Sequence, residues 1–217
     1  MARGKQIQNL AVESFRGGGT KNMFSKRCDW NVDDLTAEGY PPLLGYVFGN
    51  QGYRSLLMEP DVARHRAEWR QLIKELTACG PKIRTLAESF HTKWHESHHL
   101  IRELVDDDDA LTDMLWTWLP RYSGPALRLY RGESIDRFEL GKIGSAWTDK
   151  IDTARTFARG LNARGRGGVI LDSLVPAEAI IAAPSAHSIR INECEFSVDY
   201  RKLEAITCGA SFPPSGL

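Results

Sequence analysis

The 217-residue chain is 42% hydrophobic, which suffices for a core in one or two domains. Its 28 basic residues equal its 28 acidic residues, so no overall charge draws it to nucleic acid or to an anionic membrane. We see no apolar signal-peptide core and no apolar run near the roughly 20 residues of a membrane span. Four cysteines stand without a C-x-x-C pair, which favours reduced thiols. We therefore expect a cytoplasmic chain without a membrane partner, and delivery into another cell stays open.

Residues 1–55 show little periodicity. Gly17-Gly18-Gly19 lies between basic residues, but no strand-to-helix pattern frames it, so a linker is favoured over a phosphate-binding loop. Pro41-Pro42 and the stretch from Gly45 to Gly52 predict loop.

Helical periodicity begins at Asp61 and continues to Leu119. Gly80-Pro81 separates a first helix from a second helix over 82–104. The apolar stripe of the second helix comprises Ile83, Leu86, Ala87, Phe90, Trp94 and Ile101. A third helix is expected over 107–119, with the aspartates at 106–109 supplying a cap and favourable charge at its start. We predict a mainly helical subdomain over residues 1–122.

The second helix contains a zinc-peptidase pattern. His95-Glu96-Ser97-His98-His99 satisfies H-E-x-x-H, in which two histidines one turn apart hold the metal. Helical geometry places His95 and His99 away from the apolar stripe, so we expect the pair to face water. Glu103 is available as a third ligand, but a solvated helix face is favoured and no metal site is predicted.

After Pro120 the sequence changes to short β-type runs, at 126–131, 144–148, 169–175, 179–183, 191–198 and 204–208. One helix is expected after Thr148, with Asp149 as its N-cap, Asp152 three residues on and its end near Gly160. Short strands with one crossing helix predict an α+β fold with two packed sheets over residues 123–217.

Two of these strands carry polar residues that a purely structural strand does not need. The first ends its apolar face in Arg131, and we expect Gly132 to break the strand directly afterwards. A guanidinium in that place suits a carboxylate or a phosphate. The second offers Ser145 and Thr148 around Trp147.

The strand at 191–198 places two carboxylates on one face. Alternation puts Cys194, Phe196 and Val198 on the core face, with Glu193 and Glu195 opposite. Like charges this close repel each other and raise one pKa. A fold does not need such a pair, so a functional site is indicated.

In this order, the three strands resemble the mono-ADP-ribosyltransferases of the Arg–Ser–Glu class, particularly the compact bacterial and phage versions. The matching segments are Tyr130-Arg131-Gly132, Ser145-Ala146-Trp147-Thr148 and Glu193-Cys194-Glu195, with Ala154 and Phe157-Ala158 fitting the helix after the Ser/Thr strand. The resemblance covers about residues 120–208 and implies an ADP-ribosyltransferase-like core of two sheets.

The resemblance implies a glycosyltransferase-type enzyme that cleaves the nicotinamide–ribose bond of NAD and transfers ADP-ribose to a macromolecular acceptor, protein or nucleic acid. Glu195 would hold the ribose and offset its developing positive charge. Glu193 would orient or deprotonate the acceptor, a role that goes with transfer to arginine side chains. The loop at 183–192 would recognise the acceptor. Such a protein could be a toxin, an effector or a phage-defence component, restrained by an antitoxin or inhibitor.

The resemblance also implies the cofactor-binding residues. Arg131 would bind a phosphate or ribose of NAD, with Gly132 and Trp147 beside it. Ser145 or Thr148 would brace the catalytic glutamate.

One position departs from the family. Ala146 occupies the usual place of the serine, and Ser145 falls on the opposite strand face. A bulge that turns Ser145 inward, substitution by Thr148, or loss of the contact all stay open.

Structural interpretations compete with this function. Arg131 could pair with Glu133 or a surface aspartate, and Glu193 and Glu195 could be the solvent side of an edge strand. Two other activities also stay open: an NAD glycohydrolase without an acceptor, and a zinc peptidase on the helical half.

Overall fold

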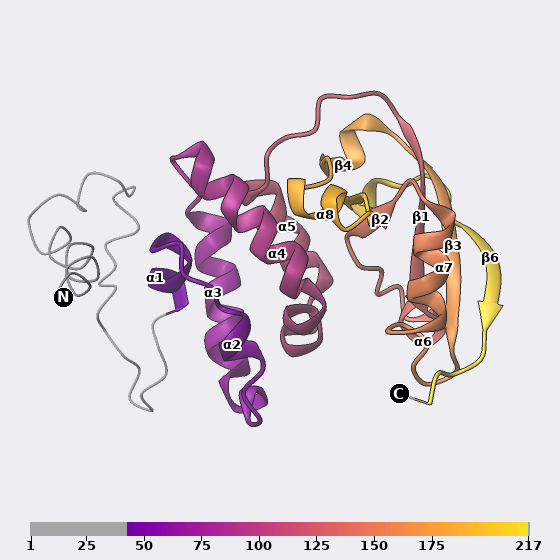
Figure 1. Cartoon of the computed structure of the whole chain (residues 1–217), viewed down its shortest axis with the longest axis horizontal. Helices are drawn as coiled ribbons and strands as arrows, with labels where there is room; N and C mark the ends of the chain where they lie inside the picture. The colour runs from indigo at the N-terminus through magenta and orange to yellow at the C-terminus, as the bar shows by residue number, and fades with distance from the viewer. Residues whose placement is uncertain (1–42, 217) are drawn as a thin grey trace, which may run out of the picture.

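The computed structural model describes residues 43–216; the stretch Gly17–Gly19 and the other residues of 1–42 lie outside the described part. The described chain is an α+β fold, as expected. Helices come first, and one six-stranded antiparallel sheet with three further α-helices follows (Figure 1). No helix in the described range is long and apolar enough to cross a membrane.

The helical half contains the three predicted helices and two shorter ones. The long helices are α3 (Arg66–Ala78, preceded by the 3-10 turn Val62–His65), α4 (Arg84–Val105) and α5 (Asp108–Trp118). Asp107 caps α5 by accepting a hydrogen bond from the Ala110 N–H, as the aspartate run indicated. The shorter helices are α1 (Leu43–Phe48) and α2 (Arg54–Leu57). Because α1 overlaps the stretch from Gly45 to Gly52 that was expected to be loop, that prediction was wrong for residues 45–48.

Large apolar side chains of these helices form the helical core. Trp69, Leu115 and Trp118 are fully buried there, and the predicted stripe of α4 packs against them through Phe90 and Trp94. The first member of the predicted stripe, Ile83, lies outside the core because it is the residue before α4 and is 42% exposed.

The strands form one continuous sheet where two packed sheets were expected. Its order is β4 (Ile180–Ala182), β5 (Glu195–Val198), β2 (Ala146–Thr148), β1 (Leu127–Ser134), β3 (Gly168–Val175) and β6 (Thr207–Phe212). Every neighbouring pair is antiparallel. β1 and β2 are paired only through Tyr130 and Thr148, so a single residue pair joins two three-stranded parts.

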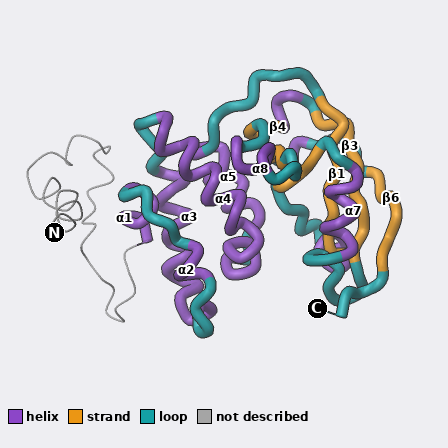
Figure 2. Tube along the Cα trace, viewed as in Figure 1, coloured by secondary structure: helices purple, strands orange, loops and turns teal. Residues whose placement is uncertain are grey.

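Helix α7 (Ile151–Arg159) lies across β1 and β3, as the view of the trace shows (Figure 2). Its N-cap is Lys150 and not the predicted Asp149, because the helix begins one residue later, at Ile151. The Lys150 N–H donates to Thr148 Oγ1 over 3.1 Å. Strand β1 also continues beyond Gly132 to Ser134, contrary to the expected break. The glycine instead permits close approach: a Cβ there would lie 2.4 Å from the Ala154 carbonyl oxygen of α7.

The remaining short elements connect the strands. They are α6 (Ile135–Glu139), α8 (Ala186–Arg190) and the 3-10 turns Ala177–Ala179 and Tyr200–Lys202. The predicted strand at 191–198 begins only at Glu195, because α8 and a turn occupy the residues before it.

The two halves of the chain share a packed interface. Ile181 and Ala182 of β4 belong to the same hydrophobic cluster as the helical core. Trp116 of α5 donates its indole N–H to Asp199 over 2.7 Å, and Arg201 pairs with Asp113 of α5 over 2.8 Å. The helices therefore have a fixed position relative to the sheet.

Candidate active site

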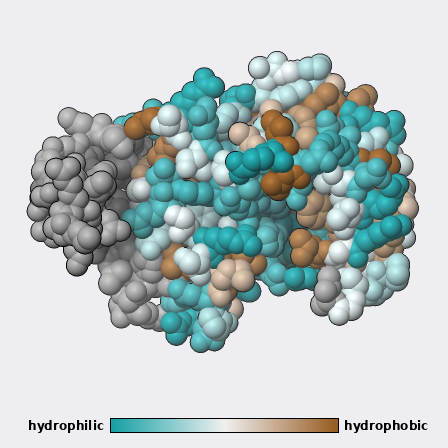
Figure 3. Space-filling view, in the orientation of Figure 1, coloured by the Kyte–Doolittle hydropathy of each residue, from teal (hydrophilic) through white to brown (hydrophobic). Residues whose placement is uncertain are grey.

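A cavity of about 570 Å³ lies between α4 and the sheet half. The surface there is hollowed, and hydrophilic side chains gather around it (Figure 3). Six of the seven predicted site residues line this cavity, namely Arg131, Gly132, Trp147, Thr148, Glu193 and Glu195. The seventh, Ser145, lines a separate small cavity next to it.

Glu193 and Glu195 face the same cavity, but not because they alternate along one strand, as was predicted. Glu193 precedes β5, and Cys194 between the glutamates has a φ of 49°, so strand alternation does not bring them together. Ser188 of α8 holds this bend instead. Its carbonyl oxygen accepts from the Glu193 N–H over 3.0 Å, and its hydroxyl oxygen accepts from the Glu195 N–H over 2.7 Å.

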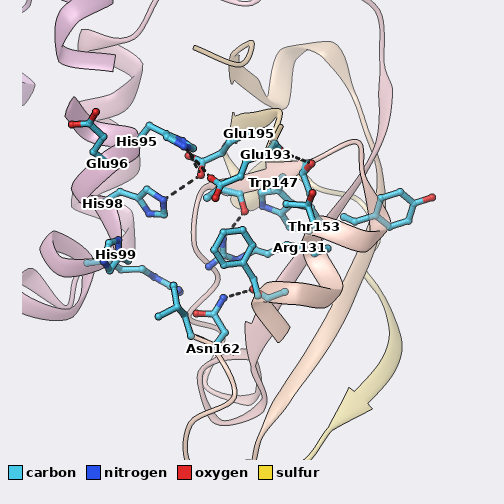
Figure 4. A pocket seen from close by; sticks show the side chains of 18 of the residues that line it. His95, Glu96, His98, His99, Arg131, Trp147, Thr153, Asn162, Glu193 and Glu195 are labelled. Atoms are coloured by element: carbon cyan, nitrogen blue, oxygen red, sulfur yellow. Dashed lines mark hydrogen bonds and ion pairs between the residues drawn. The ribbon is translucent and has the colours of Figure 1, made fainter. Parts of the chain in front are cut away.

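His95 projects from α4 toward both carboxylates (Figure 4). Its Nε2 is 3.0 Å from Glu193 Oε2, and its Nδ1 is 3.3 Å from Glu195 Oε2. His95 is only 7% exposed, so the expectation that it faces water was wrong. The polar face of α4 packs toward the sheet half, which the helix pattern alone does not show. His99, one turn on, is exposed as expected but borders the cavity.

A second histidine contacts the same carboxylate. His98 Nε2 lies 3.2 Å from Glu195 Oε2 (Figure 4). Burial alone would raise the pKa of Glu195, but the charge of His98 and hydrogen bonds from His95 and His98 hold it well below its ordinary value. Burial would lower the pKa of His95, but its hydrogen bonds to Glu193 and Glu195 raise it to about 10. Both groups are therefore charged at neutral pH.

Arg131 does not reach into the cavity with a free guanidinium. It is 6% exposed, its Nε donates to Glu133 Oε2 over 2.9 Å, and its Nη1 donates to the Ala146 carbonyl oxygen over 2.5 Å. The alternative pairing with Glu133 is therefore what the structure contains, in the core and not on the surface. Burial lowers the pKa of Arg131 from its ordinary value.

Glu133 is the centre of a buried charge network. It is fully buried and also accepts from Arg102 of α4 and from the Gly144 N–H over 3.0 Å. Although burial opposes ionisation, Arg131 and Arg102 lower the pKa of Glu133 to about 2. Arg102 in turn contacts Asp108 at the start of α5 over 2.7 Å. The network ties the helical half to the strand that carries the arginine motif.

The Ser/Thr strand contributes through Thr148 rather than Ser145. The Thr148 hydroxyl donates to the Glu193 carbonyl oxygen over 2.7 Å, so it braces the main chain beside the glutamates. It does not hydrogen-bond the Glu195 carboxylate, which was the expected contact. Trp147 is buried and donates its indole N–H to the Gly144 carbonyl oxygen over 3.1 Å.

The peptidase pattern does not assemble a two-histidine site. Within residues 43–216, the group whose ligand atoms could hold a metal consists of His95, Glu193 and Glu195, with atoms within 4.8 Å of one another. His99 is not part of it. The ion pairs of His95 with both carboxylates bring these atoms together.

Sequence reasoning did not assign His95, His98, Ser188 or Arg102 to this site. The zinc-peptidase pattern drew attention to the histidines, but it gave no signal of their glutamate partners. Comparisons with family models, with curated proteins and with solved structures find nothing that matches this chain.

The site combines two carboxylates, a cationic histidine and an aromatic side chain around one cavity. Its volume lies within the range of small-molecule sites. A buried carboxylate whose pKa is held low can stabilise positive charge that develops on a bound molecule. A second carboxylate, 32% exposed, can accept a proton from a second reactant.

Proposed function

We propose that the chain is an NAD-dependent mono-ADP-ribosyltransferase. The observation that supports this most is the convergence of Arg131, Trp147, Thr148, Glu193 and Glu195 on one cavity. These residues come from three segments far apart in the sequence, and they match the three motifs of the Arg–Ser–Glu class in order. The two three-stranded parts of the sheet on either side of Tyr130 and Thr148 would correspond to the two-sheet core of that class.

In the proposed reaction the nicotinamide–ribose bond breaks and leaves a cation-like ribose carbon. Glu195 would hold a ribose hydroxyl and stabilise this charge, because its pKa keeps it ionised. Glu193 would orient the acceptor and take its proton. Thr148 would fix the main chain of Glu193 through its hydrogen bond. Nicotinamide leaves, and the acceptor, with arginine favoured, gains the ADP-ribosyl group.

Arg131 has a different role in this proposal from the one the resemblance implied. Its guanidinium is engaged by Glu133 and by the Ala146 carbonyl oxygen. It would therefore hold the strands that line the cofactor site in position, and it would not bind a phosphate directly. A toxin or effector role, with an antitoxin or inhibitor as partner, belongs to the same proposal.

The test is incubation of the full chain with NAD labelled in its adenosine part, together with cell extract. We expect nicotinamide release and label on protein or RNA, both abolished by Glu195→Gln. Glu178→Gln, the same change at an exposed glutamate outside the cavity, serves as the control. Nicotinamide release without macromolecular label would indicate a glycohydrolase. Chelator-sensitive peptidase activity without NAD turnover would refute the proposal in favour of a zinc peptidase.

A further inference from the structure

Helix α4 presents a row of cationic and imidazole side chains to the cavity. His95, His98, His99 and Arg102 are spaced by three, four and seven residues from the first, so they lie along one face of the helix. A neighbouring face of α4 carries Phe90, Trp94 and other residues of the helical core. One wall of the candidate active site therefore belongs to the half of the chain that the resemblance does not cover.

Both ring nitrogens of His95 lie within ion-pair distance of a carboxylate. Ionised carboxylates only accept hydrogen bonds, and both ring nitrogens of His95 face a carboxylate oxygen at 3.0 and 3.3 Å. A neutral imidazole can donate from one nitrogen alone. A doubly protonated ring can therefore bridge Glu193 and Glu195 by pairing with both at once, and the raised pKa of His95 agrees with that state.

We infer that His95 is a positioning residue of the active site, which holds Glu193 and Glu195 ionised and oriented for ADP-ribosyl transfer. This inference rests on the proposed function. Without a cation between them, two neighbouring carboxylates repel each other and one takes up a proton. A protonated Glu195 could not stabilise a cation-like ribose, and a protonated Glu193 could not act as a base. The bridge prevents both losses.

The bridge leaves each carboxylate one oxygen for the substrates. The ion pairs of His95 and His98 with Glu195, and of His95 with Glu193, are made to Oε2 in each case. No side chain or main-chain group in the described range hydrogen-bonds either Oε1 atom. A ribose hydroxyl and an acceptor can therefore reach Glu195 and Glu193 while His95 stays in place.

The test compares steady-state kinetics of the wild-type chain, His95→Ala and His95→Gln. We expect His95→Ala to lower kcat by up to about 100-fold while KM for NAD stays near its wild-type value, because orientation and not binding is lost. His95→Gln keeps one donor and should retain more activity than His95→Ala. Added imidazole should restore part of the kcat of His95→Ala.

The matched control is His65→Ala, which removes another buried histidine of the helical half, away from the cavity. It should lower the thermal stability without lowering kcat in proportion. An unchanged kcat in His95→Ala would overturn the inference. A raised kcat would also overturn it, because His95 would then be inhibitory. So would a stoichiometric metal ion that is present in the purified wild-type chain and absent from His95→Ala.

Nuclear magnetic resonance separates this inference from the proposed function. The bridge would be supported by two downfield ring N–H signals that vanish in His95→Gln. One of them should shift in Glu193→Gln and the other in Glu195→Gln. Their presence in a chain that leaves NAD intact would retain the bridge and reject the proposed reaction. A single ring N–H signal, or none, would overturn the inference whatever the activity.

Discussion

Arg131 and Glu133 form an ion pair within β1, with Nη2 of the arginine 2.8 Å from Oε2 of the glutamate and both side chains buried. The arginine of the first motif is therefore held by a carboxylate in the same strand. Arg102 of α4 contacts the same Oε2 atom at 3.0 Å, so two guanidinium groups share one carboxylate.

Removal of the charge of Glu133 should destabilise the fold. In Glu133→Gln, Arg131 and Arg102 would stay buried without their anion, and breaking a buried pair in this way costs about 3–5 kcal/mol. Urea unfolding measures this change. The control is Asp172→Asn, which breaks a pair with Arg128, a side chain that is 67% exposed, and an exposed pair contributes about 0–1 kcal/mol. Similar losses in the two variants would contradict the central role of Glu133.

Gly132→Ala should disturb the contact between β1 and α7. The new methyl group would lie 2.4 Å from the Ala154 carbonyl oxygen and 2.5 Å from the Ala158 nitrogen, both in the main chain. The helix must then move away from the strand, so we expect a lower melting temperature and a large loss of NAD cleavage. The control is Gly52→Ala, whose new methyl group meets nothing within 4 Å. Gly141→Ala is unsuitable because the φ of Gly141 is 71°, a backbone conformation that strains any residue with a side chain. Wild-type stability in Gly132→Ala would contradict the tight approach.

Glu193→Ala should weaken transfer more than hydrolysis. Glu193 is the more exposed of the two glutamates, 32% against 11% for Glu195, so it is the one placed to meet a second reactant. We expect macromolecular label to fall further than nicotinamide release when both are measured in one reaction. An equal loss of the two products would show that Glu193 does not serve the acceptor.

The bridge of His95 should make stability depend on pH. The pKa of His95 rises from 6.5 to about 10 in the folded chain, so its contribution is complete below pH 6.5 and is lost as the pH rises toward 10. The lowered pKa of Glu195 acts in the opposite sense: its contribution is complete above about 4.5 and declines as the pH falls below that value. The difference in stability between wild type and His95→Gln should therefore be largest between about pH 4.5 and pH 6.5. Thermal unfolding from about pH 4.5 to about pH 10 measures it, and a difference that is constant from pH 6.5 to 10 would exclude the bridge.

The long helices could be predicted because their apolar residues repeat over many turns. α1 and α2 could not, since six and four residues are too short to show a helical period. The single sheet was also missed, because the pairing of β2 with both β1 and β5 depends on contacts between distant segments. Gly132 was assigned as a strand break, although its reason is a helix packed on top of it.

The residues of the β half of the site could be predicted because each belongs to a short motif. Their partners could not. His95 contacts glutamates about a hundred positions away. Nothing in the local pattern of α4 distinguishes a histidine that faces water from one that faces a carboxylate. The roles of Arg131 and Thr148 shifted for the same reason, since each is set by a neighbour that lies elsewhere in the chain.

The one residue pair between β1 and β2 also affects how variants of the arginine motif must be interpreted. The hydrogen bond from Arg131 to the Ala146 carbonyl oxygen links β1 to β2 at this junction. The side chain therefore adds a contact between two strands that are paired through one residue pair. Replacing Arg131 would remove this link beside Trp147 and Thr148, which line the cavity. Loss of activity in such a variant is expected from the weakened contact between β1 and β2 alone. It is therefore no evidence that Arg131 contacts the cofactor.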